Sequence, residues 1–225
     1  MKDRALIPVE GKAPKKIMSI LRWFDEWATG KGEVYDKKGA KIRDATRQGY
    51  KLIFYDSNIP RNCVVELNDG TRLFLKKTMY RGDIEAYEKL SHRKLKICPS
   101  IFGYYKKRTR TLIVREFVEG EPIDNVDLEK LPKDELENFS RMLGKKLHSL
   151  HGAKITLPWD VEIIITPEGE PYFVDFDRAY GRFSTTSKVR DIKKMADRII
   201  ESNVSPRYLE LFNKSYGGIL TKKKD

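Results

Sequence analysis

The chain has 225 residues, of which 40% are hydrophobic and 35% charged, as in a soluble globular protein with an ample core. No apolar run approaches the roughly 20 residues that span a bilayer, and the first residues lead into no apolar signal segment. The net charge of +12 raises nucleic acid as a partner. However, the basic residues are scattered and form no RNA-binding motif, which argues instead for a solvated surface that attracts anionic substrates or an anionic membrane surface.

The two cysteines, Cys63 and Cys98, lack the spacing of a metal site. Few cysteines and no leader favour a reduced, cytoplasmic compartment. The basic surface adds a peripheral position at the inner membrane as an alternative location.

Residues 1–49 form the first segment. Apolar side chains recur at helical spacing and predict an amphipathic helix over residues 13–28. The Gly- and Lys-rich stretch that follows, residues 30–49, is typical of a connector.

The pattern then changes to strands separated by turns. Asp69 and Gly70 mark a tight hairpin turn, because this pair readily adopts positive φ. A helix follows the third strand and carries Ile84, Tyr87 and Leu90 on one face. The predicted strands are 50–55, 63–67, 73–77, 100–105 and 111–117, and the predicted helix is 83–92.

Beyond residue 119 the pattern is mainly helical. Residues 133–150 predict a helix that ends at Gly152, residues 188–202 a second helix, and Pro206 begins a third. Two apolar strands, 161–165 and 172–176, are joined by a turn and predict a hairpin. Residues 216–225 form a basic tail. The positions expected to face the core are Leu136, Phe139, Leu143, Leu147 and Leu150 in the first helix, and Ile192, Met195, Ile199 and Ile200 in the second.

Three motifs occur in a shared order that resembles the protein-kinase-like superfamily. They are the strand and hinge at residues 114–120, the helix end at residues 147–151, and Asp175-Phe176-Asp177-Arg178 after the hairpin. The last is similar to the Asp-Phe/Leu-Asp-Arg of lipopolysaccharide core kinases, including the Kdo kinases. The resemblance implies an α+β, two-lobed fold. Residues 50–118 would form a five-stranded antiparallel N-lobe with one helix, and residues 119–215 a reduced, mainly helical C-lobe with a β-hairpin.

The resemblance also implies a site for ATP and Mg²⁺. Asp175 would ligate the metal and Glu162 would assist it, since magnesium takes hard oxygen ligands. Asp177 and Arg178 would pair with each other or with the neighbouring loop.

The third strand and the hinge complete the expected nucleotide site. Lys76 would hold the phosphates, with Lys77 as the alternative, and Glu85 on the following helix would position that lysine. Glu116 and Val118 lie in the expected adenine-binding hinge. Arg115, beside it, is expected to reach a carboxylate or the surface, because an unpaired buried guanidinium is costly.

The catalytic loop departs from the family pattern. Counting back from the hairpin places Glu162 where the family has a metal-binding Asn, and Leu157 where it has the catalytic Asp. Asp160 is then the candidate base, at the cost of a shortened loop, and a turn or helix-capping role is its alternative. The loop between the first two strands, residues 56–62, also lacks the glycines that cradle phosphates.

The expected function is that of an atypical ATP- and Mg²⁺-dependent kinase that phosphorylates a hydroxyl of a glycan, a lipid-linked sugar or a protein. The displaced catalytic loop supports an alternative, a pseudokinase that binds a nucleotide or a partner without transferring phosphate.

Overall fold

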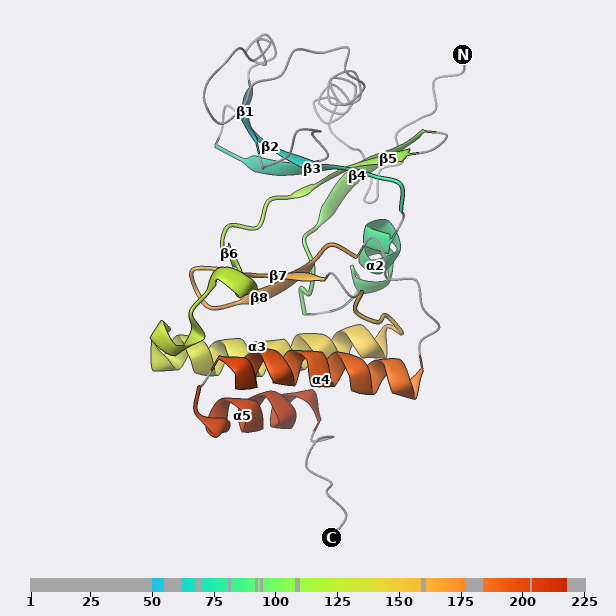
Figure 1. Cartoon of the computed structure of the whole chain (residues 1–225). Coiled ribbons are helices and arrows are strands. Elements are labelled where there is room, and N and C mark those ends of the chain that lie inside the picture. The colour runs from blue at the N-terminus through green and yellow to red at the C-terminus, as the bar shows by residue number, and fades with distance from the viewer. Residues whose placement is uncertain are drawn as a thin grey trace. The chain divides into compact units, whose positions relative to one another are not determined.

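The computed structural model describes residues 50–54, 62–67, 70–80, 82–91, 93, 95–107, 110–158, 161–176, 184–202 and 204–217. They form a mixed α+β structure with two antiparallel sheets, shown in Figure 1. The chain divides into two compact units. Unit one comprises Met1–Arg81 and Ser100–Phe117, and unit two comprises Gly82–Pro99 and Val118–Asp225. The predicted helix over residues 13–28, the connector that follows it and most of the basic tail lie outside the described residues.

Unit one contains a five-stranded antiparallel sheet in the order β1-β2-β3-β5-β4. Alternating apolar residues give each central strand one buried face, for which Leu73 and Leu75 in β3 are examples. Gly70 has φ +81, as the predicted Asp-Gly turn requires. Burial raises the pKa of the Cys63 thiol well above its usual range, so this cysteine packs as a small apolar residue. The strands are β1 (Tyr50–Phe54), β2 (Asn62–Leu67), β3 (Arg72–Thr78), β4 (Ile101–Lys107) and β5 (Arg110–Glu116).

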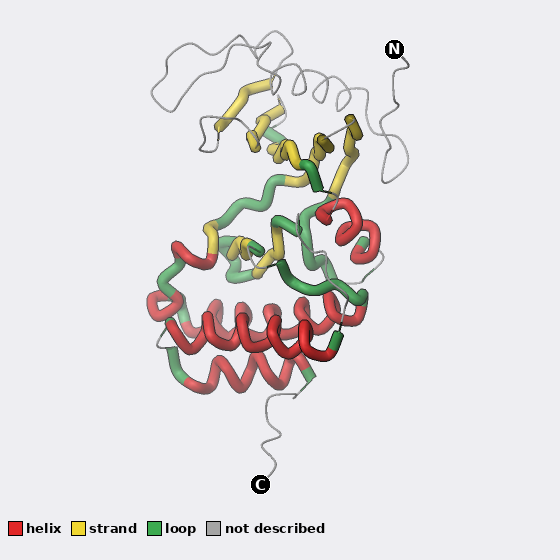
Figure 2. The backbone as a smooth tube through the Cα atoms, turned by 45° about the vertical axis from the view of Figure 1, so that its right-hand side comes forward, coloured by secondary structure: helices red, strands yellow, loops and turns green. Residues whose placement is uncertain are grey.

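Unit two combines a three-stranded sheet with helices. Figures 1 and 2 show α3, α4 and α5 running alongside one another, with β7 and β8 stacked over α3. The sheet has the order β6-β7-β8, in which the short β6 extends the predicted hairpin. The elements are α2 (Gly82–Leu90), β6 (Glu121–Pro122), the 3-10 turns η3 (Ile123–Asn125) and η4 (Leu128–Lys130), α3 (Lys133–Gly152), β7 (Glu162–Ile165), β8 (Pro171–Val174), α4 (Thr185–Glu201) and α5 (Pro206–Tyr216).

Every strand and helix that the sequence predicts within the described residues is confirmed, with small differences at the ends. The predicted apolar stripe of α3 is buried throughout, as is most of that of α4. Ile200 is the exception, because its side chain is 55% exposed on the outer side of α4. The predicted stop of α3 at Gly152 is also displaced, since Gly152 is still helical, Ala153 is the C-cap and Lys154 adopts φ 59.

Side-chain caps fix the beginnings of the last two helices. Ser184 and Ser187 form a capping box at the start of α4, with each hydroxyl bonded to the other residue's backbone N–H. Ser205 caps α5, which has Pro206 in its first turn and ends at Gly217 with φ +109. These caps satisfy backbone groups that would otherwise have no partner.

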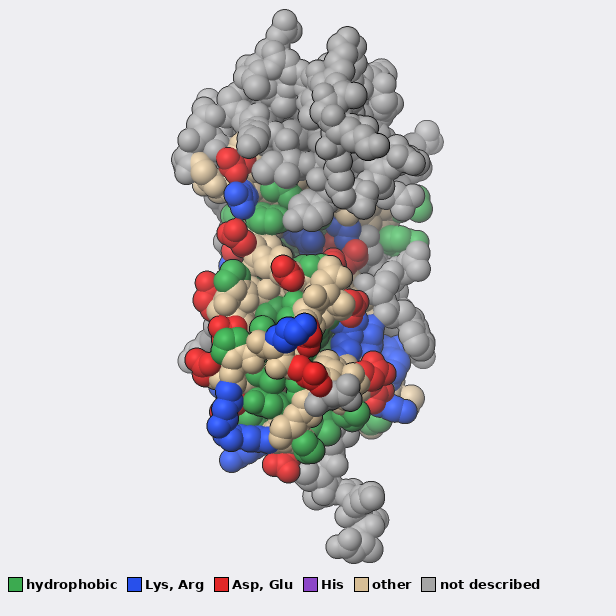
Figure 3. All heavy atoms as spheres, turned by 60° about the vertical axis from the view of Figure 1, so that its left-hand side comes forward, with side chains coloured by type: hydrophobic (Ala, Val, Ile, Leu, Met, Phe, Trp, Pro, Cys, Tyr) green, Lys and Arg blue, Asp and Glu red, His purple; other side chains and the backbone are tan. Residues whose placement is uncertain are grey.

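On the face of the molecule drawn in Figure 3, acidic and basic side chains are interspersed among hydrophobic ones. No helix among the described residues combines the length and the apolar character that crossing a membrane requires.

Gly144 sets the distance between α3 and α5. A Cβ atom at this position would lie 2.4 Å from the Phe212 carbonyl oxygen, closer than van der Waals contact allows. The neighbouring atoms belong to the backbone of α5, so a side-chain rotation cannot relieve the clash.

We expect Gly144→Ala to lower the free energy of unfolding by about 1–3 kcal/mol, as overpacking of a core does. Gly152→Ala is the matched control, since its Cβ would meet only the end of Arg93 at 4.0 Å. The control should be neutral or stabilising by up to about 1 kcal/mol, because alanine favours a helix over glycine. Urea denaturation measures both, and equal effects would contradict the close approach of the two helices.

Candidate functional site

In unit one, strand β3 carries two adjacent lysines, one of which is more deeply buried than the other. Lys76 is 3% exposed, whereas Lys77 is half-buried. In the sheet, Lys76 lies opposite Ile113 of β5. Lys76 is thus the more buried of the two lysines. It is also the one that the sequence analysis prefers as the phosphate-binding residue.

The end of β5 is held to the start of β4 through Glu116. The Ser100 N–H donates to Glu116 Oε2 at 3.1 Å, and the Glu116 N–H donates to the Ser100 carbonyl at 2.8 Å. Glu116 therefore uses its carboxylate to fix the strand that leads to the expected hinge.

Arg115 has an aromatic neighbour where a carboxylate or the surface was expected. It is 8% exposed, and its guanidinium carbon lies 4.4 Å from the centre of the Phe74 ring, directly across the β3–β5 ladder. A cation over an aromatic face is favourable when partly desolvated. The buried Nε makes no hydrogen bond, so this stacking is the contact that the sequence did not reveal.

In unit two, the hairpin brings two of the predicted carboxylates to the same end. Glu162 begins β7 and pairs with Val174, the last residue of β8, and Asp175 follows immediately. The two acidic residues therefore flank one end of the ladder, although 13 positions separate them in sequence. The structure thus places Glu162 and Asp175 at the same end of the hairpin, and their role as metal ligands stays a prediction.

Asp175 has an unusual backbone conformation. Its φ of 66° lies in the left-handed region, which costs a non-glycine residue energy but which Asp tolerates better than most. The next residue holds this turn in place, because the Phe176 N–H donates to Asp83 Oδ1 at 2.6 Å and the Phe176 ring is buried. Strained residues that are held by their surroundings concentrate at functional sites.

Glu85 and Val118 are the other predicted site residues of unit two. Glu85 is half-buried on α2, two residues beyond Asp83, and Val118 is half-buried just before β6. Since Lys76 lies in unit one and Glu85 in unit two, the expected ion pair between them stays a prediction. Asp160, Asp177 and Arg178 lie outside the described residues.

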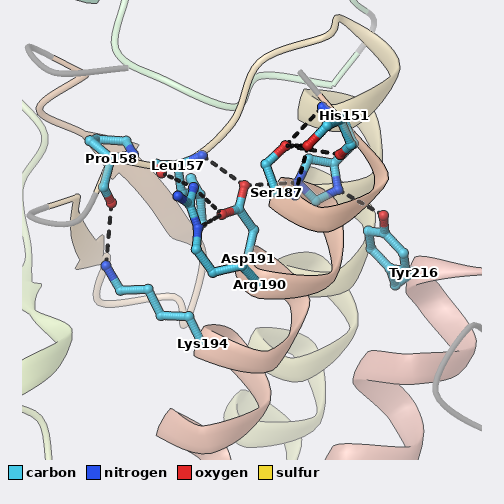
Figure 4. Close-up of polar contacts among 9 residues, drawn as sticks. His151, Leu157, Pro158, Ser187, Arg190, Asp191, Lys194 and Tyr216 are labelled. Carbon is cyan, nitrogen blue, oxygen red and sulfur yellow. Dashed lines mark hydrogen bonds and ion pairs between the residues drawn. The ribbon is translucent and has the colours of Figure 1, made fainter. Parts of the chain in front are cut away.

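Side chains of α4, among them the buried Asp191, hold the loop where the resemblance expects the catalytic carboxylate, as Figure 4 shows. The Leu157 N–H donates to Asp191 Oδ2 at 2.8 Å, and Arg190 Nη2 donates to the Leu157 carbonyl, also at 2.8 Å. One turn further on, Lys194 Nζ donates to the Pro158 carbonyl at 3.3 Å. These contacts fix the backbone of the loop up to residue 158, with the Leu157 side chain only 2% exposed.

The same carboxylate connects α4 to the other two long helices. His151 Nε2 of α3 lies 3.2 Å from Asp191 Oδ2, and His151 Nδ1 lies 2.7 Å from the Tyr216 hydroxyl of α5. Burial, with the charge of Asp191, raises the pKa of Tyr216 to about 12, so the hydroxyl stays protonated. A carboxylate only accepts, so His151 Nε2 donates to Asp191, while Nδ1 is within hydrogen-bonding distance of the Tyr216 hydroxyl. His151 therefore has a structural role, in which it joins side chains of α4 and α5.

A second buried ion pair supports the hairpin from the α3 side. The Lys146 ammonium is fully buried, lies 2.7 Å from Glu170 Oε1 and sits 4.0 Å above the Tyr172 ring. Asn138 Nδ2 donates to the Glu168 carbonyl in the same turn at 3.3 Å. Burial lowers the pKa of Lys146, and the hydrogen bond and charge of Glu170 oppose that shift. Glu170 directly precedes β8, so these contacts set the position of the strand that ends at Asp175.

Sequence reasoning missed three residues that organise this region: Asp83, Lys146 and Asp191. Each is buried and charged, yet each lies at a position where helical periodicity suggests only a polar residue. Only Asp83 had a signal in the sequence, because it is an acidic residue in the first turn of a predicted helix.

The chain matches no family model and no curated protein. Among the described residues, no group of three or more His, Cys, Asp or Glu side chains could hold a metal ion. The two carboxylates at the hairpin end do not enclose a metal by themselves. Mg²⁺ is often held by only one or two protein carboxylates and takes its remaining ligands from phosphates and water.

We expect Glu170→Ala to destabilise the protein by about 3 kcal/mol, because it leaves a buried ammonium without its counter-charge. Lys146→Met should cost less, since Glu170 is one-third exposed and remains hydrated. Guanidinium denaturation of both single variants and the double variant measures the coupling. If Lys146→Met lowered the free energy of unfolding more than Glu170→Ala, the unpaired buried ammonium would not be the more unfavourable of the two charges.

The pH dependence follows from the lowered pKa of Lys146. Just below the ordinary lysine pKa of about 10.4, Lys146 binds more protons in the unfolded state than in the folded state, so its own contribution to stability should rise with pH. Lys146→Met removes this contribution, so the free energy of unfolding of the wild type should rise relative to that of the variant as the pH rises toward 10. A wild type that instead loses stability relative to the variant over this range would contradict the prediction.

We expect Asp191→Ala to release the loop before it unfolds the protein, because the Leu157 N–H and His151 both lose their acceptor. Amide hydrogen exchange at Leu157 should accelerate more than exchange in the α3 core. Asp197→Ala, on the same helix but half-buried, is the control and should leave Leu157 protected. Uniform acceleration in all three helices would show global destabilisation instead.

Proposed function

We propose that the protein is an ATP- and Mg²⁺-dependent phosphotransferase with a two-lobed, protein-kinase-like fold. Its acceptor is a hydroxyl of a glycan, a lipid-linked sugar or a protein, and the lipopolysaccharide core kinases are the branch it resembles. Two compact units support the fold: an antiparallel sheet of five strands, and a mainly helical unit with a β-hairpin. The order of five strands with a helix after the third agrees with this proposal.

The end of the β7–β8 hairpin is the observation that carries the proposal. There Asp175, held in the left-handed conformation, lies next to the residue that pairs with Glu162. In the proposed site Asp175 and Glu162 hold Mg²⁺, which when bound neutralises charge on the ATP phosphates. Lys76 binds phosphate oxygens, Glu85 orients Lys76, and Glu116 and Val118 line the adenine site.

The buried loop favours a second candidate function, that of a pseudokinase. Leu157 occupies the position where the family pattern has the catalytic carboxylate. Its side chain is buried, and its backbone is held by hydrogen bonds to Asp191 and Arg190. In this alternative the protein binds nucleotide or a partner, and Asp160 has no role as a base. The loss of a general base commonly costs about 10²–10⁴-fold in rate without preventing nucleotide binding.

We expect ATP with Mg²⁺ to raise the melting temperature of the wild type, since a ligand at a hundredfold excess over its Kd stabilises by about 2.7 kcal/mol. Asp175→Asn should abolish the magnesium-dependent part of this shift. Asn is the suitable substitution because it also tolerates positive φ, so the turn is preserved. Glu168→Gln, an exposed carboxylate in the turn of the same hairpin, is the matched control and should behave as wild type.

Transfer of labelled γ-phosphate to candidate acceptors then separates the two functions. Turnover by the wild type that is lost in Asp175→Asn supports the phosphotransferase. A thermal shift without turnover on any acceptor supports the pseudokinase, and the absence of any shift at millimolar nucleotide refutes nucleotide binding in both functions.

A further inference from the structure

The fold gathers basic side chains that are scattered in the sequence onto one face of α3 and α5. This basic face consists of Arg141 and Lys145 on α3, Arg207 and Lys214 on α5, and Arg93 and Lys154 beside the end of α3. All six are exposed. His148 lies in the same stripe of α3.

Contacts at both ends place the two helices side by side along this face. At one end, Arg207 of α5 lies 2.7 Å and Arg141 of α3 lies 3.7 Å from the same carboxylate, Glu137. At the other end, His148 Nδ1 donates to the Tyr216 carbonyl at 2.7 Å. Between them, Gly144 lets the backbones approach closely, so the helix axes lie about 8 Å apart.

Helical spacing then aligns the charges in two rows. Arg141 and Lys145 are four residues apart, and Arg207 and Lys214 are seven apart, so each pair projects from one face of its helix. Arg93 donates to the Gly152 carbonyl at 3.0 Å and extends the α3 row past its end. The α3 pair spans about 6 Å and the α5 pair about 10 Å, so several cations lie within one Debye length of one another.

Three acidic residues lie on or beside the basic face: Glu137, Glu210 and Asp134, which is exposed on α3 seven residues before Arg141. Glu137 is 22% exposed and already paired with two arginines, whereas Glu210 is exposed in the middle of α5. Six cations against three carboxylates leave a formal excess of 6 − 3 = +3 on this face. Such an excess must be balanced by counterions, which a polyanion can displace with a gain in entropy.

We infer that the basic face of α3 and α5 binds the phosphodiester backbone of a nucleic acid. Nucleic acid presents about one charge every 1.7 Å along a duplex, a density that matches closely spaced rows of lysine and arginine. A membrane surface is the competing partner, but helices that lie on membranes place large apolar side chains beside their basic ones. The exposed large apolar residues within the described part of the chain are Met79, Phe102, Val189 and Ile200, and none is on α3 or α5.

The contacts expected are independent of base sequence. Asn138, an exposed amide on the same side of α3, already donates to the Glu168 carbonyl, so phosphate contacts would dominate. This binding does not depend on whether the proposed nucleotide site is active.

The test is the charge reversal of two exposed lysines of this face, Lys145→Glu with Lys214→Glu. Fluorescence anisotropy with a labelled random-sequence DNA duplex of about 20 base pairs, and an RNA duplex of the same sequence, measures affinity between about 50 and 200 mM salt. We expect at least about tenfold weaker binding. The slope of log K against log salt should become shallower by about 1.8, or about 0.9 for each lost phosphate contact.

Lys89→Glu with Lys193→Glu is the matched control, because it changes the charge equally at exposed positions of α2 and α4. The control should retain near-wild-type binding and salt slope. Equal weakening by both double variants would mean that net charge alone attracts the duplex and would overturn the inference. So would a wild type that binds neither duplex, or that sediments with phosphatidylserine vesicles while binding no duplex.

Discussion

The buried carboxylate of Asp191 is the contact on which the arrangement of unit two depends. Through one oxygen it accepts from the Leu157 backbone and faces His151, and through the other it receives the neighbouring Arg190. His151 in turn reaches Tyr216, so three helices and one loop share a single buried charge. A carboxylate this well enclosed is stable only when its hydrogen bonds are satisfied, which makes the loop and the helices mutually dependent. Removing any member leaves a polar group unpaired in the core rather than merely losing one bond.

The hairpin that ends at Asp175 has a separate support with the same physical logic. Its turn is attached to α3 through the Lys146–Glu170 pair, and its exit is attached to α2 through Asp83. Both ends of β8 are thus tied by buried charged groups to different helices. The left-handed conformation of Asp175 persists because these attachments leave the chain few alternatives. The same attachments hold Asp175 and Glu162 at a fixed end of one short ladder, as a metal site requires.

Periodicity predicted the elements well because burial of one face imposes a period of 2 on strands and 3.6 on helices. The core stripe of α3 is an example, since every predicted position is buried. Three kinds of feature escaped this reasoning. Strand β6 has two residues, too few to show a period. Ile200 follows the helical spacing but lies near the end of α4, where its side chain is exposed. Asp191 and His151 are 40 residues apart, and nothing in a single sequence marks two polar residues as partners.

Of the candidate site, the sequence predicted the carboxylates at the hairpin end because they belong to a local motif. The register that joins Glu162 to Val174 follows directly from a hairpin. The basic face was not predictable in the same way. Its residues come from segments 93, 141–154 and 207–214, which are separated in sequence and become neighbours only when α3 packs against α5.

The contacts of Asp191 also constrain how the protein could orient an acceptor. Leu157 and Pro158 are held by α4 through their backbone groups, so the apolar Leu157 side chain is directed into the core. An acidic side chain substituted there would be buried without water, at a cost of several kcal/mol unless it found a partner. In the proposed phosphotransferase, a carboxylate of this loop that orients the acceptor would therefore come from the residues after 158. Asp160 is the nearest acidic residue between that point and the hairpin. In the proposal, the residues between the loop and strand β7 would then separate a phosphotransferase from a pseudokinase.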